Sequence, residues 1–384
     1  MRQAWVLGAV GDVFLNRPAP GEALHHAAPA LQAVDVMFGN CEGVFTATPH
    51  YAPTAGFRLV ANPTNAEPLI DVGFDVLSFA NNHTVDGGHE AMLDMLKMFR
   101  ERGVAVVGAG RNVFEARRGA TRAVHEVRVT FLAYTCVYQA GYEARTNVPG
   151  VAAIRVHTHY YIPSDGYARV EPGCRPHVTT FPVPEDEQSL TTSIASARGA
   201  SDVVVVSIHW GESTKPASLT HYERRLGRLA IDSGADVVLG HHHHILRGIE
   251  LHNGKPIFYG LGHFAFDMPG MEALSPEQIN KWREVSEYVI YPREGYPLLP
   301  FHPDTRMTMI GLCEFDGKSL GRVGFIPCLI NSTNQPIPLT LCSEEGLRIL
   351  EYMRSITGEA GLATQYDRGD FVVGGCEAVL AISK

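Results

Sequence analysis

The chain has 384 residues, of which 45% are hydrophobic and 19% charged, so it carries enough apolar material for a compact globule with a large core. Its formal net charge is -9, from 41 acidic and 32 basic residues. This balance argues against nucleic acid or an anionic membrane surface as a partner, because both require a basic footprint. We therefore expect a small-molecule or peptide substrate as the partner.

We expect neither an export signal nor a membrane-spanning segment. The opening run MRQAWVLGAVGD is too short to span a bilayer and lacks an Ala-x-Ala-like cleavage site, and no later segment approaches about 20 apolar residues. The seven cysteines form no Cys-x-x-Cys pair and are odd in number, which favours reduced thiols over a disulfide framework or a cysteine zinc site. We expect a cytoplasmic protein.

Short apolar runs alternate with helical patterns, a rhythm typical of an α/β protein. Strands are predicted at residues 4–10, 34–38, 74–79, 104–107, 129–134, 202–208, 235–239 and 256–260. Helices are predicted at residues 64–72, 88–102 and 217–233, and the last two end just before a glycine, as many helices do.

Two stretches interrupt this rhythm, and a third follows it. Residues 155–187 and 266–305 are rich in Pro, Gly, Tyr and His, and we interpret both as loop insertions near the site. The first could close over the site as a lid or could be an ordinary solvated loop; its aromatic and histidine residues include His157, His159, Tyr160 and Tyr161. Residues 306–384 are predicted to form a hairpin near 307–330, with an Asp-Gly turn, and a helix near 343–357. We interpret residues 1–384 as a single domain.

Polar residues of metal-binding types follow five of the predicted strands, at the point where each strand ends. In chain order they are Asp12, Glu42, Asn82 with His83, His209, and the four histidines 241–244. In open α/β sheets the carboxyl ends of the strands border one crevice, so these side chains should converge there. Carboxylates, amide oxygens and neutral imidazoles are together suitable ligands for a divalent cation. The sequence therefore predicts a metal site at this edge.

Each of these residues has a plainer interpretation when it is taken alone. Asp12 follows a glycine and could be a turn or N-cap residue, and Asn82 and His83 could belong to an ordinary loop. A lone histidine such as His209 is more often structural than a ligand. The joint pattern favours the metal site, and its mixed nitrogen and oxygen ligands suit Zn²⁺, Mn²⁺ or Fe²⁺ while remaining compatible with Mg²⁺ or Ca²⁺.

Six motifs carry a resemblance to a known family. In order they are GDVFLNR, FGNCEGVFT, SFANNHTVDGG, VVVSIHWGES, VVLGHHHHILRGIE and IFYGLGHFAFD. With them the chain resembles the bacterial capsule-synthesis CapA (poly-γ-glutamate) family of the calcineurin-like metallophosphoesterase superfamily. The resemblance runs from about residue 5 to 267 and resumes near 307–330. It implies a four-layer α/β/β/α sandwich with mixed sheets and a metal at the strand ends, which residues 306–384 complete.

The resemblance also implies a set of metal ligands, matched motif by motif. They are Asp12, Glu42, Asn82, His209, His242 and His244. The last two follow the family's usual Gly-x-His-Pro-His pattern, with His243 in place of the proline. The plain superfamily pattern Gly-His-x-His would select His241 and His243 instead. We expect His242 and His244 to be the ligands, and His241 and His243 to contact substrate or to lie beside the ion.

Two departures from the family pattern bear on the number of ions. Phe14 stands where the superfamily has the histidine of Asp-x-His, and His263 replaces the family's usual asparagine. Loss of an imidazole weakens one of the two superfamily positions, so a complete two-metal centre is in doubt. We expect one firmly bound divalent ion and leave the second site open.

The remaining candidates concern catalysis and substrate binding. The resemblance implies that His83 protonates a leaving group or steadies the transition state, with Asp86 orienting it. Glu212 is a candidate acceptor for a ligand imidazole, and His263 is a candidate acid or base. Arg17 and Arg58 are candidate anchors for a carboxylate or phosphate, although each could be an ordinary structural or surface arginine.

These residues support three functional hypotheses. The first is a soluble metal-dependent hydrolase of an ester, amide, lactone or phosphoester bond. The second is a metal-assisted epimerase, isomerase or lyase, which the additional histidines at 241, 243 and 263 favour because hydrolysis does not need them. The third is a non-catalytic accessory protein of polyglutamate capsule synthesis, which the family name suggests. The sequence leaves the oligomeric state open.

Overall fold

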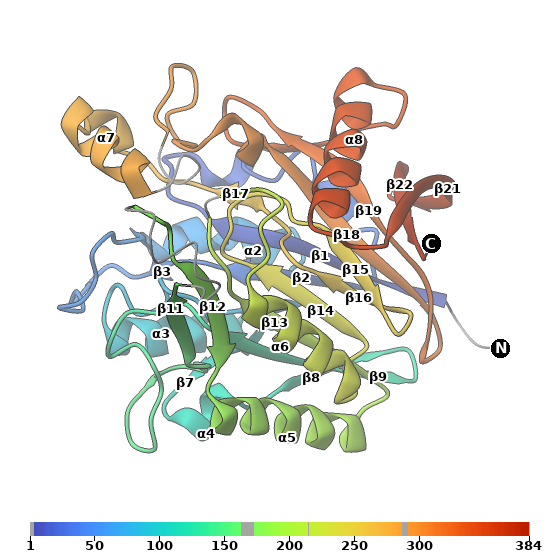
Figure 1. Cartoon of the computed structure of the whole chain (residues 1–384), viewed down its shortest axis with the longest axis horizontal. Coiled ribbons are helices and arrows are strands. Elements are labelled where there is room, and N and C mark those ends of the chain that lie inside the picture. Colours follow the sequence, from blue (N-terminus) through green and yellow to red (C-terminus); the bar gives the residue numbers. More distant parts are fainter. Residues whose placement is uncertain (1–3, 163–172, 214, 286–290, 384) are drawn as a thin grey trace.

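Two mixed β-sheets form the centre of the molecule (Figure 1). The computed structural model describes residues 4–162, 173–213, 215–285 and 291–383. The first sheet runs in the order β21-β22-β19-β18-β1-β2-β5-β6, with β17 paired to β1 and β20 paired to β19. Its strands are β1 (Ala4–Phe14), β2 (Val36–Cys41), β5 (Val76–Ser78), β6 (Ala105–Val107), β17 (His263–Phe266), β18 (Met307–Asp316), β19 (Ser319–Ile330), β20 (Pro336–Pro338), β21 (Gln365–Val373) and β22 (Cys376–Ile382).

The second sheet runs in the order β15-β16-β14-β13-β9-β8. Its strands are β8 (Ala120–Val124), β9 (Val127–Thr135), β13 (Val203–His209), β14 (Val237–His241), β15 (Ile249–His252) and β16 (Lys255–Phe258). Strands β9, β13, β14 and β16 are parallel to one another, as are β1, β2, β5 and β6 in the first sheet. Parallel central strands place their carboxyl ends at a common edge of each sheet.

Helices lie around the two sheets and partly cover their outer faces. In sequence order they are α1 (Ala28–Leu31), α2 (Glu67–Asp71), α3 (His89–Glu101), α4 (Val113–Ala116), α5 (Pro184–Ala200), α6 (His221–Asp232), α7 (Pro276–Val285) and α8 (Glu344–Glu359). Helices α2 and α3 pack on the first sheet, α5 and α6 pack on the second, and α8 packs on β19. Two short strand pairs, β3 (Val44–Phe45) with β4 (Val60–Ala61) and β7 (Ala109–Gly110) with β10 (Gly150–Val151), lie outside the main sheets.

Period-two alternation explains how each sheet buries both faces. On β13, Val203 and Val205 face the core shared by the two sheets, whereas Val204 and Val206 face α5 and α6. Across the shared core, Phe38 of β2 stacks on the ring of Phe131 of β9, with centroids 5.8 Å apart. The result is a four-layer α/β/β/α sandwich with mixed sheets, and the predicted fold class is confirmed.

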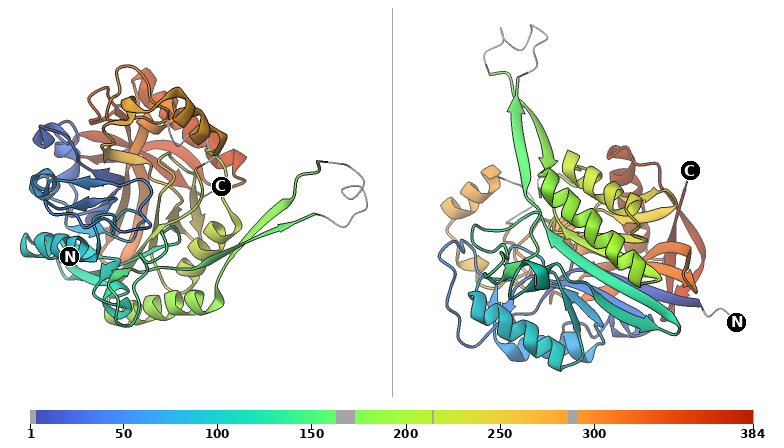
Figure 2. Two further views of the ribbon diagram at one scale, coloured as in Figure 1. Left: turned by 90° about the vertical axis from the view of Figure 1, so that its left-hand side faces the viewer. Right: turned by 90° about the horizontal axis from the view of Figure 1, so that it is seen from below.

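The structure differs from the sequence prediction in residues 155–187. Strands β11 (Val156–Tyr161) and β12 (His177–Pro182) form a two-stranded antiparallel hairpin, and α5 already begins at Pro184. Figure 2 shows this hairpin projecting away from the body of the molecule rather than lying over it as a lid. Alternating polar and β-favouring residues such as those in VHTHYY are typical of an exposed strand, a signal that the Pro and Gly content concealed.

The structure also adds elements in two other regions. Residues 266–305 contain the end of β17, the helix α7 and two short 3-10 helices, η3 (Met271–Ala273) and η4 (Pro303–Arg306). Residues 306–384 contain the predicted hairpin and helix and, in addition, the antiparallel pair β21 and β22. Within the described ranges, no helix is both long enough and apolar enough to cross a lipid bilayer. All seven cysteines are free thiols, as expected.

Candidate metal centre

The predicted ligand residues meet where the parallel strands end. Asp12 lies in β1 opposite Asn40 of β2 on one side and opposite His263 of β17 on the other. In the second sheet, His209 ends β13 opposite His241, which ends β14. Two sheets that each contribute strand ends to the same edge can therefore bring side chains together from positions far apart in the sequence.

Two groups of three side chains have ligand atoms close enough to share an ion. Group A consists of Asp12, His244 and His263, and group B consists of Glu42, His209 and His242. Within each group the ligand atoms all lie within 4.8 Å of one another. The groups adjoin, because His244 Nδ1 lies 3.2 Å from an oxygen of Asp12 and 3.9 Å from an oxygen of Glu42.

Both groups contain buried polar atoms that have no hydrogen-bond partner. They are Asp12 Oδ2, both carboxylate oxygens of Glu42, Nδ1 of His242 and of His244, and both ring nitrogens of His263. Leaving a buried polar group unsatisfied costs about 1–3 kcal/mol, and native folds rarely tolerate several in one place. Carboxylates and imidazoles that face one another in this way fit a divalent cation, which would satisfy them together.

The electrostatics of the cluster also suit a cation. Burial raises the pKa of Glu42 well above its ordinary value, and the neighbouring carboxylate of Asp12 raises it further. Burial likewise tends to raise the pKa of Asp12, but the adjacent imidazoles, His244 first among them, outweigh burial and lower the pKa. Burial lowers the pKa of three imidazoles of groups A and B well below 6.5, those of His209, His242 and His263. The neutral imidazoles are in the protonation state that a metal ion requires, and a bound cation would stabilise the ionised form of Glu42.

Three asparagines surround the two groups. Asn82 Oδ1 lies 2.7 Å from His209 Nε2, so this predicted ligand lies beside group B. Asn40 donates a 2.8 Å hydrogen bond to Asp12 Oδ1 and thereby leaves Oδ2 free to face the imidazoles. Asn81 donates to the carbonyl oxygen of Cys41 and accepts from the backbone N–H of His83. Hydrogen bonds of this kind hold ligands in a fixed orientation.

The four-histidine segment distributes its side chains between the centre and the structure behind it. His242 and His244 have φ values of 95° and 59°, a left-handed backbone that is uncommon outside glycine, and both belong to the ligand groups. His241 is buried near Asp12, with its Nδ1 3.8 Å from a carboxylate oxygen. His243 points the other way and hydrogen-bonds to a different acid. The structure thus brings the preferred pair into the cluster.

That acid is Glu223, which sequence reasoning missed. Its Oε1 lies 2.8 Å from His243 Nε2, and both side chains are fully buried. Burial tends to raise the pKa of Glu223, but the charge of His243 and its hydrogen bond outweigh burial and lower it, so the carboxylate accepts from the imidazole. Glu223 also closes a capping box with Thr220 at the start of α6, and the Thr-x-x-Glu pattern was the available signal. Glu212, the expected acceptor, lies on the neighbouring loop, where its carbonyl accepts from Arg247.

The predicted acid His83 forms a hydrogen-bonded chain next to the centre. Its Nδ1 lies 2.7 Å from Asp86 Oδ2, and Asp86 Oδ1 accepts a 2.8 Å hydrogen bond from the hydroxyl of Tyr142. Asp86 also accepts from the backbone N–H of Leu59 and is completely buried. His83 lies close enough to His242 to lower the pKa of that imidazole. Tyr142, which sequence reasoning did not select, completes the orientation of Asp86.

The two predicted substrate arginines lie in different environments. Arg17 forms a buried ion pair with Asp267, and its Nη1 and Nη2 each donate a 2.9 Å hydrogen bond to a backbone carbonyl, those of Thr333 and Asn334. Arg58 is exposed, with its guanidinium 4.3 Å from the centroid of the Tyr51 ring. Arg17 therefore links Asp267, directly after β17, to the backbone of Thr333 and Asn334, whereas Arg58 lies at the surface.

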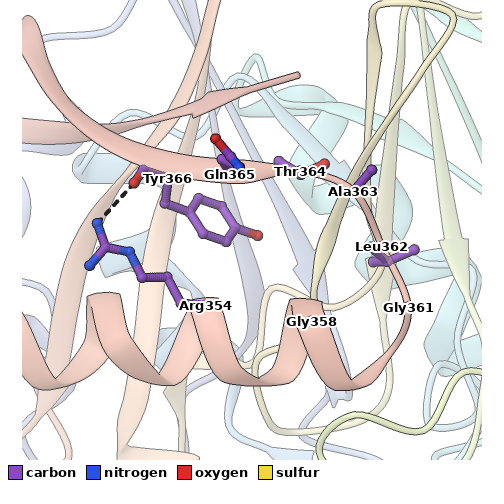
Figure 3. Close-up of a pocket in the computed structure, with 8 residues that line it drawn as sticks. All are labelled: Arg354, Gly358, Gly361, Leu362, Ala363, Thr364, Gln365 and Tyr366. Carbon is purple, nitrogen blue, oxygen red and sulfur yellow. Dashed lines mark hydrogen bonds between the residues drawn. The ribbon is translucent and has the colours of Figure 1, made fainter. Parts of the chain in front are cut away.

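Two surface cavities in the described part of the chain have linings that contain no member of group A or group B. A cavity of about 550 Å³ lies between the end of α8 and the start of β21, and Figure 3 shows Arg354 reaching the backbone oxygen of Tyr366 across it. Its lining includes none of the predicted site residues. The lining of a second cavity, of about 570 Å³, includes Tyr51 and Tyr142, and Tyr142 is the residue whose hydroxyl donates to Asp86.

Together, the fold and the cluster define a class of protein: an α/β/β/α sandwich with a candidate metal-binding centre of carboxylates and imidazoles at its strand ends. A family model for the bacterial capsule synthesis protein PGA_cap matches residues 6–268. The chain belongs to this family, which the six sequence motifs indicated.

Relatives and solved structures extend this comparison. The chain is 30% identical over 268 residues to the PGA biosynthesis protein CapA of Bacillus subtilis, covering 67% of this chain and 62% of the relative. It is 28% identical over 271 residues to the capsule biosynthesis protein CapA of Bacillus anthracis, covering 67% of this chain and 59% of that relative. The match thus spans about 60% of the length of these relatives. Among solved structures, a hypothetical protein from Thermus thermophilus is similar, with 15% identity, coverage of 84% of this chain and 98% of that chain, and a TM-score of 0.46.

Proposed function

We propose that this protein is a metal-dependent hydrolase that acts on an ester, amide, lactone or phosphoester bond of a small substrate bearing a carboxylate or phosphate. The observation that carries the proposal is the adjacency of groups A and B, with the His83–Asp86 pair beside them. When bound, divalent ions supply a Lewis acid for a substrate oxygen and acidify a water molecule. Zn²⁺, Mn²⁺ or Fe²⁺ suit the imidazole-rich ligands better than Mg²⁺ or Ca²⁺.

The side chains of the site divide the remaining work. Asp12 and Glu42 bring two carboxylates into a buried space, where they balance the charge of bound cations. Asn40 orients Asp12 and Asn82 lies against His209, so the ligand geometry is set before substrate arrives. Such prior organisation reduces the reorganisation required during the reaction.

His83 is the proposed acid for the leaving group. Its hydrogen bond to Asp86 through Nδ1 leaves Nε2 as the nitrogen that can exchange a proton with substrate. Tyr142 and the backbone of Leu59 both donate to Asp86, so the carboxylate is held in one orientation. This chain of contacts positions the imidazole.

Proton-transfer chemistry is the alternative, and the histidines that suggested it have other surroundings in the fold. His243 is engaged with Glu223, and His263 belongs to group A. Only His241 is left among the additional histidines, and it is buried behind Asp12. These contacts favour hydrolysis over an epimerase, isomerase or lyase. The names of the relatives suggest an accessory role in polyglutamate synthesis. A non-catalytic role would not require the hydrogen bonds that join His83, Asp86 and Tyr142.

A substrate screen tests the proposal. Metal-free protein is reloaded with Mn²⁺, Zn²⁺ or Ca²⁺ and assayed against phosphate esters, p-nitrophenyl esters and γ-glutamyl amides. We expect turnover with at least one substrate class, and a loss of about 10²–10⁴-fold in kcat for His83→Gln. His26→Gln, at an exposed position, is the matched control and should retain full activity.

The outcomes separate the three hypotheses. Entry of solvent deuterium into an otherwise unreacted substrate carbon would identify proton transfer. Absence of turnover and of deuterium exchange with every metal would leave the accessory role.

A further inference from the structure

We propose that His263 is a metal ligand that replaces, from β17, the imidazole missing at Phe14 of β1, so that the centre holds two ions. The inference rests on the metal-dependent function proposed above. It assigns His263 a role different from the acid or base that its position in the sequence suggested. It also changes the expected number of firmly bound ions from one to two.

The backbone places His263 beside Asp12. Strand β17 runs parallel to β1 with Asp12 opposite His263, and the N–H of Asp12 donates a 3.0 Å hydrogen bond to the carbonyl of Gly262. The approach is so close that a Cβ on Gly11 would lie 1.8 Å from that carbonyl oxygen. A glycine at position 11 is therefore what allows β17 to reach the metal centre.

The surroundings of His263 suit a ligand and not a proton carrier. Its side chain is fully buried, and neither ring nitrogen has a hydrogen-bond partner. The ring stacks on Phe266 at 4.7 Å, meets Phe301 edge-on at 4.5 Å and lies 4.3 Å from the ring of His244. A general acid or base needs contact with solvent or with an orienting partner, whereas a neutral imidazole among aromatic rings needs only a cation for its lone pair.

Phe14 explains why a replacement is needed. Its ring packs against Phe45 and Phe266, at centroid distances of 5.3 Å and 6.2 Å, and a Cβ on Gly43 would lie 2.3 Å from it. The side chain therefore fills space beside Gly43, the residue after Glu42, but offers no lone pair. Phe266 touches both Phe14 and His263, so the lost and the gained imidazole positions border the same aromatic ring.

The consequence is a balanced pair of sites. With His263, group A has one carboxylate and two imidazoles, the same ligand types as group B. Without it, group A would retain only Asp12 and His244. A site with two imidazoles favours Zn²⁺, Mn²⁺ or Fe²⁺ over Mg²⁺ and Ca²⁺.

The test is metal stoichiometry, which needs no knowledge of the substrate. Purified full-length protein is stripped, dialysed against Mn²⁺ or Zn²⁺ and analysed for bound metal. We expect about two ions per chain in the wild type and about one in His263→Asn, which restores the residue type usual in the family. His25→Asn, at an exposed position, should keep both ions. His209→Ala, in group B, should lose one ion while the group A ion remains.

A measurement on the wild type alone guards against a variant that fails to fold. Protein loaded with Mn²⁺ should give the electron paramagnetic resonance signal of a coupled ion pair. Two ions retained in folded His263→Asn, or an uncoupled single ion in the wild type, would overturn the inference. Two ions in the wild type and one in His263→Asn, without turnover of any substrate, would uphold the ligand assignment and defeat the hydrolase.

Discussion

Removal of the Arg17 side chain separates a structural role from a substrate-binding role. The guanidinium and the carboxylate of Asp267 have exposed side-chain fractions of 7% and 0%, and two N–H groups of the arginine point at the carboxylate. Arg17→Met would leave that carboxylate buried, with hydrogen bonds only from the N–H of Asn16 and the amide of Asn334. Breaking a buried ion pair from one side typically costs about 3–5 kcal/mol.

The expected thermal shift follows from the size of the chain. An unfolding entropy of about 2.1 cal/mol/K per residue gives about 0.8 kcal/mol/K for 384 residues, so the melting temperature should fall by about 4–6 °C. Differential scanning calorimetry and urea unfolding measure this change. Arg58→Met is the matched control, because an exposed arginine stacked on Tyr51 contributes about 0.5–1 kcal/mol and its loss should cost about 1 °C.

The opposite pattern would refute the structural assignment of Arg17. If Arg17→Met melted within about 1 °C of the wild type and raised the KM of an anionic substrate, the arginine would be a substrate anchor, as its sequence position suggested. If the calculated loss of stability appears with an unchanged KM, Arg17 acts through Asp267 alone.

Three further outcomes are expected. Gly11→Ala should push β17 away from β1 by more than about 1 Å, since the new Cβ would lie 1.8 Å from the backbone oxygen of Gly262. Calorimetry should show a lower melting temperature, and elemental analysis should show a loss of bound metal. Gly21→Ala, which has open space around it, should show neither effect. Glu223→Ala removes the hydrogen-bond partner of His243 and the glutamate of the capping box at the start of α6. The free energy of unfolding, measured by urea titration, should fall by about 2–4 kcal/mol. An unchanged urea midpoint would contradict this prediction. Burial lowers the pKa of His241 to about 4 in the folded protein. Between pH 6.5 and pH 4 the imidazole is therefore protonated in the unfolded chain but not in the folded one. The free energy of unfolding of the metal-free protein should fall by about 3 kcal/mol as the pH is lowered through this range. A His241→Asn variant should flatten that part of the pH–stability curve.

The sequence by itself determined the fold class and pointed to most of the residues that meet in the candidate metal centre. Alternating apolar runs and helical patterns predicted an α/β protein, and the family resemblance implied the four-layer sandwich. Polar residues at the ends of strands predicted the convergence of Asp12, Glu42, His209 and the four-histidine segment. These predictions succeed because burial on both faces of parallel strands leaves a local apolar signal, and because strand ends converge whatever the loops do. The hairpin of β11 and β12 was missed because its exposed strands carry only an alternating polar pattern, which the surrounding Pro and Gly residues concealed.

Only the tertiary structure decided how each polar side chain is used. No local pattern distinguishes an arginine paired with Asp267 from one that awaits a substrate, because the partner lies 250 positions away in the chain. In the same way, Glu223 meets His243 across a gap of 20 residues, and His263 meets Asp12 only because β17 pairs with β1. Residue type limits what a side chain can bind, but the packing of distant strands determines which atoms remain without a partner and so are available for chemistry.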